Sequence, residues 1–88
     1  MNLQDYRKTI DALDLQIVTA FTERMAVAEK IAQYKKKQGL AITDTKREEE
    51  KLESLTALMP EGLAKEIRLL YHTIFDLSKE RQRKIFSD

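Results

Sequence analysis

Two cationic residues interrupt an otherwise apolar pattern in the first half of the chain. Arg24 belongs to a series of positions spaced by seven residues, whose other members are Ile10, Ile17 and Ile31. Burying an arginine among apolar side chains costs free energy unless an anion meets it. Lys35 follows Arg24 by eleven residues, about three helical turns, and so lies within roughly 20° of the same helix face. The pattern predicts two cations that point in the same direction from the helix.

A third cation, Arg7, precedes Arg24 by seventeen residues. In one continuous helix this spacing places Arg7 about 100° around the helix and roughly 25 Å from Arg24. If all three cations serve one pocket, we expect Arg7 to come from a second copy of the chain.

Polar residues also cluster in the two segments that follow. Asp44, Arg47 and Glu48 gather at the expected start of a second helix, where Arg47 and Glu48 can turn toward the first helix. Ser78 and Gln82 stand four residues apart in the expected third helix, and this spacing places them on one face. All five are candidate ligand-binding residues.

Each candidate also has a plainer interpretation when it is taken alone. Either cation of the first helix could set the register of a coiled coil or extend its charge to the surface. The serine and glutamine of the third helix would form a solvated edge. The two acids of the second helix would be helix-capping residues. His72 is the only histidine in a chain without cysteine, so we interpret it as structural.

Three helices, long, short and long, are expected to position these residues. No proline or glycine occurs from Asp5 to about Gln38, and apolar residues recur at helical spacing through this range. Gly39 ends the first helix, and residues 39–43 form a short connector.

The second helix has both a start signal and a stop signal. Thr45 is followed three residues later by Glu48, which fits a capping box. The helix should end before Pro60, because proline disfavours helical geometry in the residue that precedes it. The sequence Pro-Glu-Gly should then form a turn, and the third helix should run from Leu63 to about Phe86.

The composition limits the class of protein. The chain has 88 residues, 42% hydrophobic and 35% charged, with two glycines and one proline, which favours an all-α domain. The absence of cysteine excludes a disulfide framework, a thiolate zinc site and a cysteine nucleophile. A formal net charge of +1 lacks the basic surplus of nucleic-acid-binding proteins. No signal peptide or long apolar run is present, so we expect a cytoplasmic protein without a membrane partner.

The length of the first helix bears on assembly. About 34 helical residues at roughly 1.5 Å each extend about 50 Å. A compact chain of this size has a diameter of roughly 30 Å. Part of the first helix would therefore project uncovered, and a second copy of the chain can cover it. We expect a homodimer.

Taken together, the candidate residues resemble the pattern of the all-helical class of chorismate mutases. In that family an arginine occurs early in the first helix, followed by a Glu-Arg pair and by a lysine eleven residues later. A loop ending in aspartate, an Arg-Glu pair and, in the last helix, a serine with a glutamine or glutamate four residues on complete the pattern. The matching residues here are Arg7, Glu23, Arg24, Lys35, Asp44, Arg47, Glu48, Ser78 and Gln82.

The resemblance covers essentially the whole chain and implies that residues 1–88 form one chorismate mutase domain. It implies an intertwined six-helix homodimer that rearranges chorismate to prephenate in phenylalanine and tyrosine biosynthesis. This rearrangement breaks a C–O bond while a C–C bond forms, and it needs no nucleophile, acid, base or cofactor. The chain departs from many relatives at Met25 and Ala41, but neither position is expected to supply a side-chain donor.

The resemblance also implies three catalytic residues, Arg24, Lys35 and Gln82. Arg24, with Arg7 of the partner subunit, would clamp the carboxylates of chorismate, because the planar guanidinium suits bidentate binding. Lys35 and Gln82 would donate hydrogen bonds to the ether oxygen, where charge develops as the bond breaks. Because Gln82 is an amide, we expect nearly constant activity across neutral pH.

Four further residues complete the substrate-binding set that the resemblance implies. Glu48 would accept a hydrogen bond from the ring hydroxyl, with help from the backbone near Asp44. Ser78 would reach the ring carboxylate, and Arg47 would brace the site. We expect loss of these residues mainly to weaken binding.

Three other functions stay open. An isochorismate-pyruvate lyase shares the helical dimer and a similar set of pocket residues. A regulatory, weakly active mutase domain could belong to a larger assembly. A helical interaction module would use its polar residues only to set register and partner choice. The full set of arginines and acids around the connector favours the mutase.

Overall fold

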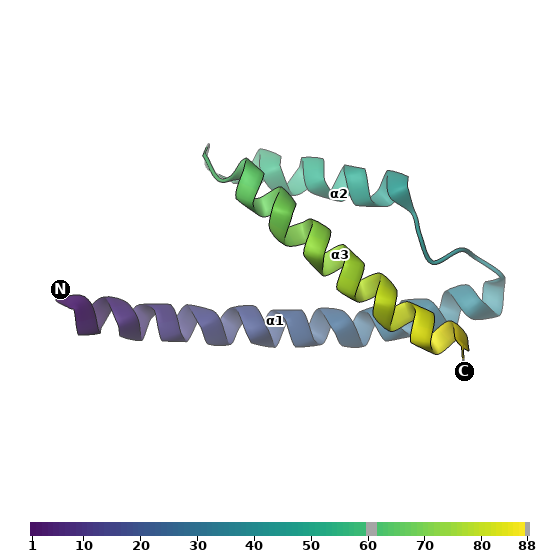
Figure 1. Cartoon of the computed structure of the whole chain (residues 1–88), viewed down its shortest axis with the longest axis horizontal. Coiled ribbons are helices and arrows are strands. Elements are labelled where there is room, and N and C mark those ends of the chain that lie inside the picture. Colours follow the sequence, from purple (N-terminus) through teal and green to yellow (C-terminus); the bar gives the residue numbers. More distant parts are fainter. Residues whose placement is uncertain (60–61, 88) are drawn as a thin grey trace.

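The computed structural model describes residues 1–59 and 62–87, and in them the chain forms three helices. They are α1 (Leu3–Gln38), α2 (Thr45–Leu58) and α3 (Ala64–Ser87) (Figure 1). No strand occurs in these two ranges. The predicted all-α fold with a long, a short and a long helix is therefore confirmed. In the same ranges no helix is long and apolar enough to cross a membrane.

The ends of α1 follow from local hydrogen bonds. Asn2 and Asp5 form a capping box, in which the side chain of each accepts from the backbone N–H of the other. The helix therefore begins at Leu3, two residues before the predicted start. At the other end Gly39 adopts a φ of 70°, a left-handed conformation that glycine reaches without strain. The predicted stop at Gly39 is confirmed.

The predicted capping box at Thr45 and Glu48 is wrong. Asp44 is the N-cap of α2, and its Oδ1 accepts a hydrogen bond from the backbone N–H of Arg47 at 2.9 Å. Aspartate and threonine both cap helices well, but a carboxylate gains further from the positive end of the helix dipole. α2 therefore begins at Thr45, one residue earlier than a cap at Thr45 would place its start.

The other helix boundaries lie close to the predictions. α2 ends at Leu58, before Pro60 as expected. The predicted Pro60-Glu61-Gly62 turn lies outside the described residues except for Gly62. α3 begins at Ala64 and ends at Ser87, one residue later at each end than predicted.

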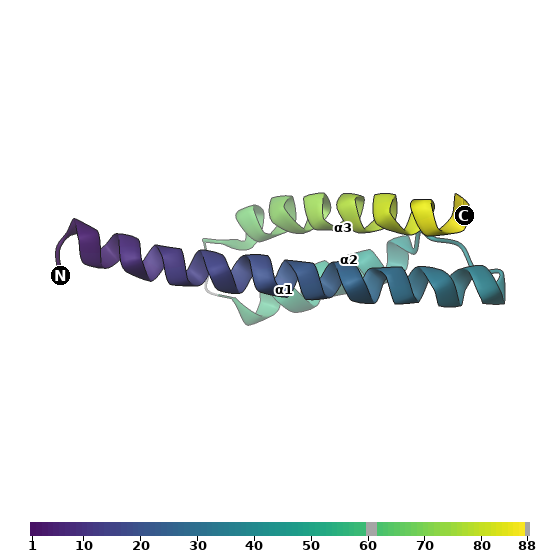
Figure 2. The ribbon, with the colours of Figure 1, turned by 90° about the horizontal axis from the view of Figure 1, so that it is seen from below.

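Both α1 and α2 pack against α3. In the described part of the chain α1 and α2 make no close backbone approach to each other. Figures 1 and 2 show α3 crossing the carboxyl-terminal half of α1, while α2 lies apart from α1. The buried apolar side chains are few and come from all three helices: Ala28, Ala32, Leu52 and Phe75. α3 therefore organises the small core, and a space is left between α1 and α2.

The amino-terminal half of α1 projects beyond the rest of the molecule. The chain extends 54 Å along its longest axis and only 26 and 15 Å along the others. Every residue from 1 to 20 is exposed. Neither α2 nor α3 covers this half (Figures 1 and 2), which confirms that the first helix outruns its own domain.

Candidate active site

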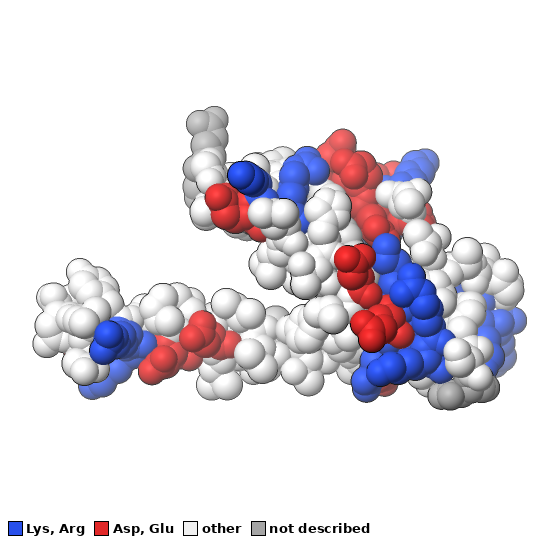
Figure 3. All heavy atoms as spheres, viewed as in Figure 1, with Lys and Arg blue, Asp and Glu red and all other residues white. Residues whose placement is uncertain are grey.

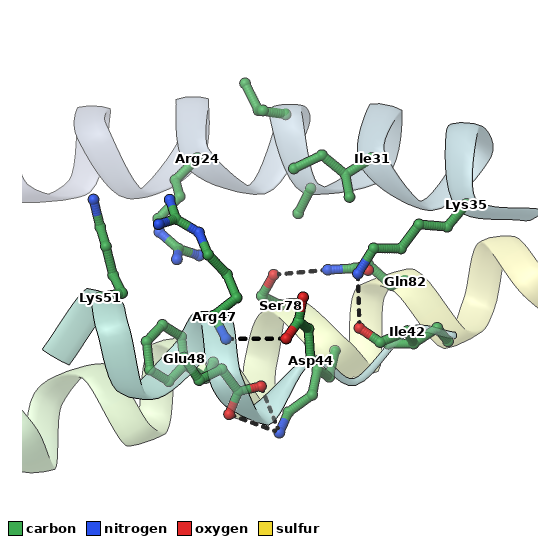
Figure 4. A pocket seen from close by; sticks show the side chains of 14 residues that line it. Arg24, Ile31, Lys35, Ile42, Asp44, Arg47, Glu48, Lys51, Ser78 and Gln82 are labelled. Atoms are coloured by element: carbon green, nitrogen blue, oxygen red, sulfur yellow. Dashed lines mark hydrogen bonds and ion pairs between the residues drawn. The ribbon is translucent and has the colours of Figure 1, made fainter. Parts of the chain in front are cut away.

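A pocket of about 340 Å³ opens between α1 and α2, with α3 as its third wall. This volume is in the range of pockets that bind small molecules. Seven of the eight predicted site residues line it (Figure 4): Arg24, Lys35, Asp44, Arg47, Glu48, Ser78 and Gln82. Candidates from three separate segments of the sequence thus meet around one cavity.

The two predicted cations of α1 reach this pocket together. Arg24 and Lys35 both extend from α1 toward α2 in Figure 4. The Arg24 guanidinium carbon lies 5.8 Å from the centre of the Phe75 ring and 6.0 Å from that of Tyr71, within the range of cation–π attraction. Lys35 donates a hydrogen bond from Nζ to the carbonyl oxygen of Ile42 at 2.9 Å. Within the described residues neither cation has an acidic partner, so both charges remain available to an anion.

The polar pair of α3 is buried, which makes the solvated-edge interpretation wrong. Ser78 and Gln82 are 6% and 7% exposed, and Gln82 Nε2 donates to Ser78 Oγ at 3.2 Å. A primary amide has two N–H groups, so one donor is left for a ligand. Gln82 Oε1 is buried without a hydrogen-bond partner in the described part of the chain. Buried polar atoms are normally satisfied, so this amide is unusual for a purely structural residue.

The start of α2 brings three more polar side chains to the pocket. Asp44 caps the helix, so the helix-capping interpretation of this acid is confirmed. Its side chain orients the first turn. Arg47 extends from this turn toward α1 (Figure 4). Glu48 does not cap the helix, because its carboxylate contacts the ammonium of Lys79 on α3, with Nζ 3.2 Å from Oε2. The first turn of α2 therefore presents both charge signs to the cavity.

Two lysines that line the pocket were not predicted from the sequence. Lys51 extends from α2 toward α1 (Figure 4), and Lys79 lies on α3. Both stand among other charged residues, where a lysine normally indicates a solvated face. Helical spacing carried a signal nevertheless, since Lys51 follows Arg47 by four residues and Lys79 precedes Gln82 by three.

The pocket has an excess of positive charge. Among the described residues five cationic side chains line it, and only two acids do, Asp44 and Glu48. The five cations are Arg24, Lys35, Arg47, Lys51 and Lys79. A cavity with this balance favours an anion that carries more than one negative charge. In the described residues no three histidine, aspartate or glutamate side chains gather as metal ligands would.

Arg7 is the one predicted site residue that one chain does not bring to the pocket. It lies on the projecting, exposed half of α1 and is not among the pocket residues. The sequence placed it roughly 25 Å from Arg24 along one helix, and α1 is continuous through both positions.

Comparison with known protein families identifies the family of the chain. The family model for chorismate mutase type II matches residues 6–83. The chain belongs to the chorismate mutase type II family. No curated protein and no solved structure matches it significantly. The family match covers nearly the whole chain and identifies this chorismate mutase as an isomerase whose substrate is chorismate.

Chorismate has the chemical groups that the pocket is equipped to bind. It is a dianion with two carboxylates, a ring hydroxyl and an ether oxygen. The pocket is lined by surplus cationic side chains, the buried amide of Gln82 and the carboxylate of Glu48. An isomerase of this kind works by fixing one substrate conformation and stabilising developing charge.

Proposed function

We propose that this chorismate mutase converts chorismate to prephenate for phenylalanine and tyrosine biosynthesis, in a pocket completed by a second copy of the chain. The observation that carries the proposal is the meeting of seven predicted residues around one cavity. Residues 1–88 form the catalytic domain. The role proposed for each side chain follows from its chemistry and from its place in the pocket.

Lys35 and Gln82 are the proposed donors to the ether oxygen. Negative charge grows on this oxygen as the C–O bond breaks, so donors already in place stabilise the transition state more than the substrate. The Lys35 ammonium is held at one end of the pocket by the carbonyl oxygen of Ile42. The Gln82 amide is held by Ser78. Both donors are thus oriented before the substrate arrives.

Arg24 is the proposed clamp for a substrate carboxylate. The faces of Tyr71 and Phe75 hold its guanidinium without neutralising it, so the charge stays available. Ser78 would donate to the ring carboxylate, and Arg47 would brace the site from α2. Fixing the carboxylates holds the enolpyruvyl arm over the ring, which is the geometry that the rearrangement requires.

Glu48 is the proposed acceptor for the ring hydroxyl. Its carboxylate lines the pocket on the α2 side, and the backbone next to the Asp44 cap begins the same turn. This hydrogen bond would be made both to the bound substrate and to the transition state. Its loss should therefore raise KM more than it lowers kcat.

The proposed homodimer is supported by the apolar surface of the projecting half of α1. Leu3, Ile10, Leu13 and Ile17 are between 45% and 63% exposed, and Figure 3 shows much of this half without charged side chains. An exposed apolar helix of this length is typical of a protein–protein interface. A partner that covers it would also bring its own Arg7 toward the pocket, as a second carboxylate clamp.

A chorismate-consumption assay on the purified protein tests the proposal, with Arg24→Ala as the matched variant. We expect the wild type to form prephenate rapidly and Arg24→Ala to lose about 10²-fold or more in rate. Salicylate and pyruvate from isochorismate, with little prephenate, would indicate a lyase instead. Weak turnover that rises with a partner protein would indicate a regulatory domain. No turnover of either substrate would contradict the catalytic assignments.

A further inference from the structure

Glu48 has an ionic partner that the substrate-binding scheme above does not use. Lys79 Nζ lies 3.2 Å from Glu48 Oε2 and 3.5 Å from Oε1. The two side chains are only 18% and 24% exposed, and both line the pocket. The dashed lines at Glu48 in Figure 4 mark this contact. One ammonium thus meets both oxygens of the carboxylate, and this limits how the carboxylate can rotate.

A carboxylate in this position needs such a partner. Glu48 faces a cavity whose substrate is a dianion, and like charges in a partly desolvated site repel. An adjacent ammonium offsets that repulsion and leaves the outward lone pairs of the carboxylate free to accept a hydrogen bond. Lys79 lies on α3 whereas Glu48 lies on α2, so the pair also fixes Glu48 relative to the wall that carries Ser78 and Gln82.

We propose that Lys79 is a positioning residue for substrate recognition, which holds the Glu48 carboxylate oriented toward the substrate's ring hydroxyl. The inference rests on the proposed role of Glu48. It assigns to Lys79 an effect on how well chorismate binds, exerted through Glu48 and not by contact with the reacting atoms.

A second ion pair between the same helices provides the control. Arg68 on α3 lies 3.6 Å from Glu49 on α2, with side chains 40% and 62% exposed, and neither residue lines the pocket. If Lys79 only fastened α2 to α3, removing the Arg68 pair would have a similar consequence. The remaining acidic neighbour of Lys79, Asp76, lies 4.0 Å away and is 80% exposed, so solvent screens that contact.

The test compares kcat and KM of Lys79→Met, Lys79→Arg and Arg68→Met with those of the wild type. We expect Lys79→Met to raise KM for chorismate about tenfold with a smaller fall in kcat, the size expected for one hydrogen bond to a charged group. Lys79→Arg should recover most of the loss, because it keeps the charge. Arg68→Met should stay within about twofold of the wild type, as surface ion pairs contribute little.

A double-mutant cycle separates a positioning role from a structural one. In a Glu48→Gln background there is no carboxylate to hold, so adding Lys79→Met should change KM little further. Additive effects of the two substitutions would overturn the inference. An unchanged KM in Lys79→Met would also overturn the inference about Lys79. In that case turnover of chorismate by the wild type would still support the proposed function. If Lys79→Met fails to fold by circular dichroism, Lys79→Gln makes the same comparison with a polar side chain.

Discussion

The two halves of α1 share a helical spacing of apolar residues but have very different surroundings. In the carboxyl-terminal half Ala28 and Ala32 are 3% and 0% exposed, and the same half presents Arg24 and Lys35 to the pocket. In the amino-terminal half every residue up to Ala20 is exposed. One chain therefore completes the packing of only half of its longest helix.

This difference shows that helical periodicity alone does not determine burial. Apolar residues recur at the same spacing in both halves, but only the carboxyl-terminal half has α3 against it (Figures 1 and 2). Long helices in proteins are stabilised mainly by packing of an apolar face and less by intrinsic propensity. We therefore interpret the amino-terminal half of α1 as the half that a second chain covers. On this interpretation Arg7, which lies in that half, serves the pocket of the second chain.

The largest effect on activity should come from the pocket between α3 and the packed, carboxyl-terminal half of α1. Gln82→Ala removes a buried donor, and we expect kcat to fall by about 10²-fold or more, measured from prephenate formation at saturating chorismate. Gln82→Glu is the matched control. It should recover activity only toward acid pH, because a carboxyl donates only when protonated, whereas the wild type should vary little between about pH 6 and 8. A steep acid rise in the wild type would contradict the assignment of Gln82.

An intermediate effect is expected in the projecting half. Ile10→Asp places a charge on a surface that we expect a second chain to cover. Removal of such an anchor costs about 2 kcal/mol or more, so the dimer dissociation constant should rise by about 30-fold or more, measured by analytical ultracentrifugation. Thr19→Asp makes a similar change on the opposite face of α1, nine residues away, and should leave the dimer intact. Equal dissociation in both variants would indicate a general effect of charge on the helix.

The smallest effect concerns the start of α2. Asp44→Ala removes the N-cap hydrogen bond to Arg47, and we expect the free energy of unfolding to fall by about 1 kcal/mol. For a domain of this size the melting temperature should drop by about 4–8 °C. Asp44→Asn keeps a capping oxygen and should melt close to the wild type. If Asp44→Asn is as unstable as Asp44→Ala, the cap is not the source of the effect.

Most of the fold could be predicted from the sequence, because the helix signals are local. Gly39 ends α1 where a left-handed residue is needed, and α2 ends before Pro60. The start of α2 was harder to predict because Asp44 and Thr45 are adjacent residues that both cap helices. Only the hydrogen bond from the Arg47 backbone N–H to Asp44 distinguishes them.

The site was predicted where spacing along one helix determined which residues share a face. Arg24 and Lys35 are three turns apart and line the same pocket. The pairing of Glu48 with Lys79 joins two helices, and no spacing within either helix encodes it. The Lys51 side chain was overlooked because it follows a run of three glutamates, which is typical of a solvated surface.

If each pocket combines Arg24 of one chain with Arg7 of another, a mixing experiment tests this sharing most directly. Arg7→Ala and Arg24→Ala should each lose about 10²-fold or more in activity on their own. After subunit exchange, half of the dimers should be mixed, and each mixed dimer should have one intact site. The mixture should then recover up to about a quarter of wild-type activity. No recovery, with exchange verified by mass spectrometry, or full activity of Arg7→Ala alone, would contradict the shared site.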